Sequence, residues 1–300
     1  MRAARTDPSL RPIDPALQIG SVRLAVADLE ASVDFYERVL GLASSDRGAD
    51  RALFGGDGRR PLLELERIPE PVPASPHSTG LYHVAWLHPS REALAASVER
   101  VVAARWPIHG ASDHGVSEAL YLSDPDGLGV EIYADRPREH WPHAPDGEIA
   151  MFTQPLDLDD LLAQAPLDPV PVIPAAIVVG HIHLKVSDVA RAAAFYRDTL
   201  GFEEQAHMPS AAFLAAGGYH HHVGLNSWQS RGAGPPPDNA PGLRTVTFEL
   251  GSPEALDGLE ERLESAPGVS AQGERRPGRV KITDPDGHRL AFVAGGGGEG

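Results

Sequence analysis

The feature that most constrains this chain is an internal repeat. Residues 19–42 and 179–202 match in register: each has a glycine, alternating apolar residues, an aspartate, and then a helical spacing that ends in Phe-Tyr and Leu-Gly. The alternation predicts a strand and the spacing predicts an amphipathic helix, with Asp28 and Asp188 as N-caps. Two such copies indicate that the chain arose by duplication and folds as a set of similar modules.

Weaker copies follow each of these segments. Residues 80–104 and 242–266 also have the pattern of a strand and then a helix. Each is followed by Asp-Pro-Asp-Gly, at 124–127 and 284–287, which is typical of a turn that joins two strands into a hairpin. The sequence therefore predicts an α+β fold made of four βαβββ modules. Their predicted bounds are 18–67 (module 1), 80–136 (module 2), 178–228 (module 3) and 242–295 (module 4).

The modules group into two halves. We expect an N-terminal half at 18–136 and a C-terminal half at 178–295, joined by a linker at 137–177 that is rich in proline and acidic residues. A linker of that length allows the second half to dock on the first in more than one way.

Composition limits the partners. Forty-two acidic residues against 26 basic ones give a formal net charge of −16, which repels nucleic acid and anionic membranes. With no cysteine, any metal must be held by nitrogen and oxygen ligands. The N-terminus lacks the apolar core of a signal peptide and no apolar run is long enough to span a bilayer, so we expect a cytoplasmic protein.

Three residues on predicted strands form a candidate metal site. His83 lies in the first strand of module 2, His181 in the first strand of module 3, and Glu131 in the last strand of module 2. Two imidazoles and one carboxylate on rigid strands are the facial triad of non-haem iron oxygenases. Histidines on strands are more often hydrogen-bonded core residues than ligands, so the spacing alone is a weak signal.

The repeat resembles the vicinal oxygen chelate superfamily, which includes glyoxalases, bleomycin resistance proteins and extradiol dioxygenases. The stretch from His114 through Leu-Tyr121 and the Asp-Pro-Asp-Gly turn to Glu131 is similar to the signature of extradiol ring-cleavage dioxygenases, although Ser112 departs from that pattern. A second stretch, at 212–226, is similar to the family's paired histidines that follow a Phe-Leu strand. The resemblance runs from about residue 18 to residue 294 and is greatest to the two-half catechol 2,3-dioxygenases.

The resemblance implies a mechanism and roles for six residues. His83, His181 and Glu131 would bind Fe(II), or Mn(II), and the substrates would be a catechol and dioxygen. The same correspondence makes His221 the catalytic acid/base, with His114 and Tyr121 as hydrogen-bond partners of the substrate oxygens. Members of the superfamily often associate through sheet edges, so a homo-oligomer is compatible with the sequence.

The order of the modules is unusual for this family, because the module with paired histidines follows the one with His, Tyr and Glu. Pairing modules 1 and 2 leaves Ser21 at a ligand position, and pairing modules 3 and 4 leaves Thr245 and Ala291 there. Only modules 2 and 3 together supply a full triad. We therefore predict two paired-module, open β-barrel-like domains: modules 2 and 3 with the metal, and modules 1 and 4 without it.

Other residues have plainer interpretations. His183 shares its strand face with His181 and is the strongest competitor as a ligand. His220 and His222 are expected on the opposite face from His221, on a sheet surface, and the Asp-Pro-Asp-Gly turns are interpreted as purely structural. Trp86, Phe213 and Trp228 are candidate cavity walls. The remaining histidines are expected to be solvated or incidental: His77, His88, His109, His140, His143, His207 and His288.

Three functional classes remain open from the sequence. The first is an extradiol dioxygenase. The second is a glyoxalase-like isomerase or lyase with the same metal site; such relatives usually need a fourth protein ligand, commonly a carboxylate at the position of His221. The third is a metal-free binding protein of the drug-resistance type.

Overall fold

The computed structural model of the chain describes residues 11–55, 61–145, 147, 149–166, 176–265 and 278–295. Module 1 contains β1 (Gln18–Val26), α1 (Leu29–Asp34), the π-helical turn η2 (Phe35–Val39), β2 (Ala43–Arg47), β3 (Arg51–Gly55) and β4 (Leu63–Arg67). Module 2 contains β5 (Gly80–His88), α2 (Arg91–Ala103), β6 (Ile108–Asp113), β7 (Ser117–Ser123) and β8 (Gly129–Asp135).

The connection to the second half also has regular structure. It contains the 3₁₀ turn η3 (Arg138–His140), the short strand β9 (Gln154–Pro155) and α3 (Leu158–Leu162). Module 3 contains β10 (Val178–Lys185), α4 (Val189–Ala194), the π-helical turn η4 (Phe195–Leu200), β11 (Glu203–Met208), β12 (Ala211–Ala215) and β13 (Val223–Asn226). Module 4 contains β14 (Gly242–Leu250), α5 (Pro253–Ser265), β15 (Arg279–Thr283) and β16 (Arg289–Ala294); its remaining predicted strand would fall at 266–277, outside the described residues.

The local signals in the sequence produce the predicted helix boundaries. Asp28 and Asp188 are N-caps, and their side chains accept hydrogen bonds from the backbone N–H groups of Ala31 and Arg191 at 3.1 and 3.0 Å. Gly201 ends the second of these helices with φ 91°, a left-handed conformation that glycine adopts without a steric penalty.

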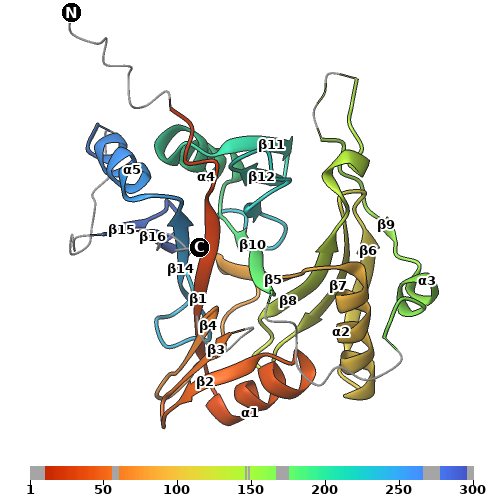
Figure 1. The fold of residues 1–300 in the computed structure, drawn as a ribbon. Coiled ribbons are helices and arrows are strands. Elements are labelled where there is room, and N and C mark those ends of the chain that lie inside the picture. Colours follow the sequence, from red (N-terminus) through yellow and green to blue (C-terminus); the bar gives the residue numbers. More distant parts are fainter. Residues whose placement is uncertain are drawn as a thin grey trace, which may run out of the picture.

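One curved sheet contains all sixteen strands of the described residues. Its main path runs β15-β16-β14-β1-β10-β5-β8-β7-β6-β9, with the hairpins β2–β4 and β11–β13 attached to β1 and β10. The helices lie on the outer side of the strands (Figure 1). The expected α+β class of four strand-helix modules is confirmed.

The pairing of modules follows from two antiparallel strand contacts. β5 of module 2 pairs with β10 of module 3, and β1 of module 1 pairs with β14 of module 4. The two pairs join where β1 meets β10, at Ile19 and Val179. In Figure 1 these four strands lie side by side at the centre of the molecule. We refer to the two units as the 2–3 pair and the 1–4 pair.

The Asp-Pro-Asp-Gly turns are structural in both copies. Asp124 and Asp284 each accept two backbone N–H groups of their own turn through Oδ1, at 2.8–2.9 Å. The hydroxyl groups of Tyr36 and Tyr196 donate to Oδ2 of the same two aspartates, at 3.4 and 3.1 Å. The Phe-Tyr motif of one module is thereby tied to the turn of the next, which explains why both motifs recur.

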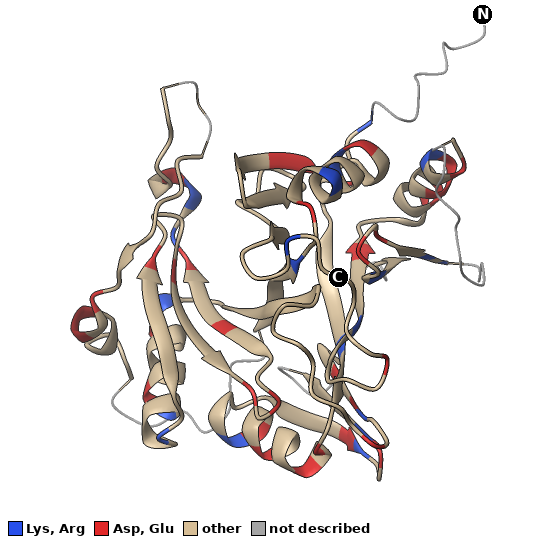
Figure 2. Ribbon diagram, turned by 180° about the vertical axis from the view of Figure 1, so that it is seen from behind, with Lys and Arg blue, Asp and Glu red and all other residues tan. Residues whose placement is uncertain are grey.

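Charged residues occur on most elements of the fold, and a few of them, such as Glu131 and Asp124, are buried. Acidic and basic positions are interspersed on the helices and outer strands (Figure 2). No helix in the described part of the chain is long and apolar enough to cross a membrane.

Candidate metal centre

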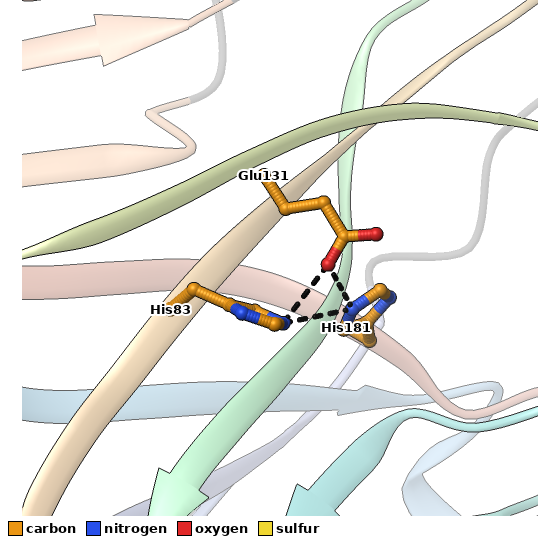
Figure 3. A group of neighbouring side chains, drawn as sticks. All are labelled: His83, Glu131 and His181. Carbon is orange, nitrogen blue, oxygen red and sulfur yellow. Dashed lines mark hydrogen bonds and ion pairs between the residues drawn. The ribbon is translucent and has the colours of Figure 1, made fainter. Parts of the chain in front are cut away.

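Three potential metal ligands converge from three adjacent strands. His83 on β5, Glu131 on β8 and His181 on β10 are all buried. Glu131 Oε2 lies 2.9 Å from His83 Nε2 and 3.1 Å from His181 Nε2, and the two Nε2 atoms are 3.3 Å apart. The carboxylate and the two ring edges face a common point (Figure 3).

These separations fit a divalent cation. With metal–ligand distances of about 2.1 Å, adjacent ligands of an octahedron lie about 3 Å apart. The three donor atoms are spaced like one face of that octahedron, and the residue types are those of the facial triad. Such a face leaves the other coordination positions free for further ligands.

The environment favours the charge states that a metal needs. Burial lowers the pKa of His181 to about 4, so its ring is neutral at physiological pH. Burial alone would raise the pKa of Glu131, but His181 and His83 beside it hold that pKa well below the usual value. A carboxylate and neutral imidazoles are the forms that bind a cation.

An irregular register between β5 and β10 directs His83 and His181 toward each other. β5 and β10 pair His83 with His183 and Ala85 with His181, and the register shifts between Val179 and His181. A bulge of this kind changes the direction of the side chains that follow it. Gly180 lies in the shifted segment, where a Cβ atom would come within 1.8 Å of the hydroxyl oxygen of Tyr133. Glycine is therefore required there for the strand to deliver His181.

His183 is close to the centre but outside the donor group. Its ring centroid is 4.9 Å from that of His83, and burial lowers its pKa well below the usual value. Its buried Nε2 has no hydrogen-bond partner among the described residues. It lines the cavity that adjoins the donor group.

His221 lies next to the donor group, in the loop between β12 and β13. Its ring centroid is 4.1 Å from that of His181. Burial, followed by the neighbouring histidines, lowers the pKa of His221 well below the usual value. The ring is therefore a neutral imidazole.

His114 and Tyr121 line the same cavity and bond to each other; the Tyr121 ring centroid is 5.9 Å from that of His83. His114 Nε2 is 2.7 Å from the hydroxyl oxygen of Tyr121, and His114 Nδ1 is 3.1 Å from the carbonyl oxygen of Phe152. A carbonyl can only accept, so His114 carries a proton on Nδ1. In the tautomer with one proton, Nε2 is bare and accepts from the Tyr121 hydroxyl group. Burial, with the charge of Glu131 as a smaller cause, raises the pKa of Tyr121, which keeps its hydroxyl protonated.

This cavity of about 950 Å³ connects the six predicted site residues and His183. Phe213 and Trp228 line it, as predicted, but Trp86 does not and lies instead in the main hydrophobic core, 1% exposed. Sequence reasoning missed the contribution of residues 149–153, which precede β9 and form one wall. The apolar run Ile-Ala-Met-Phe in an otherwise proline-rich and acidic linker was the signal for it.

Four other histidines differ from expectation. His220 and His222 are buried rather than on a sheet surface, because residues 216–222 form a loop and strand alternation does not apply to it. His88 and His288 are also buried instead of solvated. His88 Nε2 is 2.8 Å from the hydroxyl oxygen of Ser97, and His288 Nδ1 is 2.8 Å from Asp284.

Comparisons with known proteins agree with this architecture. The family model described as "Glyoxalase/Bleomycin resistance protein/Dioxygenase superfamily" matches residues 18–132 and 178–292. A catechol-2,3-dioxygenase of Bacillus subtilis (strain 168) is 43% identical over 279 residues, which cover 92% of this chain and 96% of that protein.

Solved structures show the same fold at low identity. The cppA protein of Streptococcus pneumoniae TIGR4 aligns with a TM-score of 0.57 and 12% identity, covering 93% of this chain and 100% of that one. Glyoxalase I of Zea mays aligns with a TM-score of 0.55 and 15% identity, covering 93% and 92%. Likenesses at this identity concern the fold alone.

Proposed function

We propose, because the chain belongs to the Glyoxalase/Bleomycin resistance protein/Dioxygenase superfamily, that it is an extradiol ring-cleavage dioxygenase that opens catechol or a substituted catechol with dioxygen. The observation that carries this proposal is the group of three donor atoms, 2.9–3.3 Å apart, at one wall of a large cavity with His221 beside it. The relative from Bacillus subtilis, named catechol-2,3-dioxygenase, supports the choice of reaction.

His83, His181 and Glu131 are the proposed ligands of Fe(II), for which Mn(II) can substitute because both accept this ligand set. The bound ion would supply Lewis acidity, and a common point of attachment, for the catechol oxygens and dioxygen. Every other task falls to the side chains around it.

His221 is the proposed acid/base. Its ring is neutral and lines the cavity, so a lone pair is available to take a proton from a catechol hydroxyl group and to return it later.

Tyr121 and His114 are the proposed substrate-orienting groups. Tyr121 donates to His114, so the lone pairs on the Tyr121 oxygen are available to accept from a substrate hydroxyl group. The bond from His114 to the carbonyl of Phe152 fixes this direction. The pair therefore provides a preorganised polar patch in a mostly apolar wall.

The donor set favours oxygen chemistry over glyoxalase-type isomerisation. The donor group has three members within the described residues, and the position at which glyoxalase relatives commonly have a carboxylate is occupied by His221. A carboxylate there would occupy a further coordination position.

The test is a reconstitution under anaerobic conditions. The protein is stripped with a chelator, loaded with Fe(II) or Mn(II), mixed with catechol or an alkyl-substituted catechol, and then exposed to oxygen. We expect a yellow ring-opened product that appears only with metal and oxygen together. Metal binding without that product would favour an isomerase or lyase, and no metal binding would favour a metal-free binding protein; either result contradicts the proposal.

A further inference from the structure

We propose that Asp135 and His220 are positioning residues that hold His221 in the tautomer with Nε2 free of hydrogen. This inference rests on the proposed function, because the value of that tautomer lies in the role of His221 as a base. It concerns two residues that the sequence pattern did not single out for the reaction.

The three side chains form a hydrogen-bonded chain. Asp135 Oδ1, at the end of β8, lies 2.9 Å from His220 Nε2. His220 Nδ1 lies 2.8 Å from His221 Nδ1. Asp135 comes from module 2 and the histidines from module 3, so the chain crosses the same interface as the metal ligands.

Donor and acceptor rules fix the protons along this chain. A carboxylate only accepts, so His220 donates from Nε2. We take His220 to be a neutral imidazole, which has one N–H, so His220 Nδ1 is then an acceptor and the proton between the two rings belongs to His221 Nδ1. His221 Nε2 is consequently bare, which is the form that a general base needs. A doubly protonated His220 would instead donate from Nδ1 and leave the proton of His221 on Nε2, which is the outcome that would overturn the proposal.

The opposite neutral tautomer of His220 is unfavourable. If His220 carried its proton on Nδ1, its Nε2 lone pair would face the Asp135 oxygen at 2.9 Å, and two acceptors would meet without a hydrogen between them. His220 is 1% exposed, so water cannot relieve that contact.

Aromatic side chains hold the His220 ring in place. Its centroid lies 4.1 Å from that of Tyr219, 5.4 Å from Trp141 and 6.2 Å from Tyr133. Trp141 belongs to the connection between the halves. A ring enclosed in this way cannot turn to exchange its two nitrogens without disrupting its neighbours.

The hydrogen-bonded chain gives the two ring nitrogens of His221 different roles. Nδ1 is engaged by His220, and His221 is among the residues that line the cavity, so Nε2 is the nitrogen that remains available to a substrate. Asp135 and His220 thus act through His221, as a carboxylate orients the imidazole in a catalytic triad.

The primary test is the tautomer of His221 in metal-free protein. ¹⁵N-histidine NMR distinguishes a protonated ring nitrogen from a bare one, and the His221 signals are assigned with a His221→Asn variant. We expect Nδ1 of His221 to be protonated and Nε2 bare in the wild type. A protonated Nε2 would overturn the inference, whether or not the protein cleaves catechol.

Two variants of His220 separate positioning from simple packing. His220→Leu removes the acceptor, whereas His220→Asn places a carbonyl oxygen near the former Nδ1 position and can still accept from His221. After metal reconstitution we expect His220→Leu to lower kcat by about 10- to 100-fold with KM unchanged, and His220→Asn to restore most of the loss. Equal losses in both variants would contradict the inference.

His222→Asn is the matched control for the loop. His222 is buried beside His220 and accepts the backbone N–H of Ala216 through Nδ1, a bond that asparagine can keep. It does not line the cavity, so we expect wild-type kcat and an unchanged His221 tautomer. If this variant also alters the tautomer, the loop as a whole, and not the Asp135–His220 chain, determines it. A wild-type protein with the expected tautomer but no ring cleavage would contradict the proposed function and leave this inference standing.

Discussion

The 2–3 pair and the 1–4 pair share a backbone plan but differ in chemistry. In the 2–3 pair, β5 meets β10 and β8 flanks β5; in the 1–4 pair, β14 meets β1 and β16 flanks β14. The positions of His83, His181 and Glu131 in the first pair correspond to Thr245, Ser21 and Ala291 in the second.

This correspondence shows that the fold does not require the polar cluster. Ala291 is fully buried in the 1–4 pair, whereas the 2–3 pair buries a carboxylate at the equivalent place. Burying a charge costs free energy unless it is paired or bound to a cation. The 2–3 pair therefore carries a cost in stability that the other pair avoids, and a bound metal would offset it.

The largest expected difference between the two pairs is in metal affinity, when residues at equivalent positions are substituted. His181→Ala should weaken Fe(II) or Mn(II) binding by more than about 100-fold, since even changes outside the ligand set cost about 10- to 100-fold. Ser21→Ala, at the matching position of the 1–4 pair, should leave it unchanged. Titration calorimetry under anaerobic conditions measures both. Equal affinities in the two variants would mean that the metal lies elsewhere.

Removing the proposed base should separate catalysis from metal binding. His221→Asn should lower kcat by about 10²- to 10⁴-fold, the usual contribution of general acid–base catalysis. Its metal content should match that of the wild type, because His221 is outside the donor group. Steady-state oxygen consumption and metal analysis of the same sample provide the two readouts. Loss of metal from this variant would make His221 a ligand.

The two turns should differ in their response to pH. Burial raises the pKa of Asp124 to about 7. Burial would also raise the pKa of Asp284, but the adjacent His288 holds that pKa below the usual value. The residue of module 2 that corresponds to His288 is Leu128, which carries no charge. Asp124 in the folded state therefore retains a proton that the unfolded chain loses near pH 4.

The stabilising contribution of protonated Asp124 is complete below about pH 4 and is lost as the pH rises through about 7. We expect this group to lower the free energy of unfolding by about 4 kcal/mol over that interval. Asp124→Asn carries a neutral amide and should lack this decline. Urea unfolding at several pH values measures the difference between variant and wild type, and parallel curves would contradict it.

The smallest expected difference concerns the two tyrosines that reach these turns. Tyr196→Phe removes a hydrogen bond to an ionised Asp284 and should cost about 1.5–3 kcal/mol. Tyr36→Phe removes a longer bond to Asp124 and should cost about 0.5–1.5 kcal/mol at pH 6, where Asp124 is largely protonated. Both are measured by chemical denaturation. A larger loss for Tyr36→Phe would reverse the assignment of charge to the two turns.

Much of the fold could be predicted because its signals are local. The capping aspartates, the glycine that follows a helix and the Asp-Pro-Asp-Gly turns each act within a few residues. The pairing of modules 2 and 3 was also predicted, from the absence of ligand-type side chains at Ser21, Thr245 and Ala291.

The surroundings of the site were less accessible to sequence reasoning. His220 was assigned to a sheet surface because the loop at 216–222 was treated as a strand, and Trp86 was assigned to a cavity wall although its side chain points into the core. The wall at 149–153 belongs to a segment without a periodic pattern. The proposed roles of the six site residues are still predictions.

By itself the sequence determined the modules, their turns and the residue types available for chemistry, because short-range backbone preferences and hydrophobic periodicity establish these. Only the tertiary structure decided the bulge that orients His181, the chain from Asp135 to His221, and the carbonyl of Phe152 opposite His114. Each of these contacts joins strands or loops that are far apart in sequence or depends on their register. Packing of the whole sheet sets that register, and no local pattern encodes it.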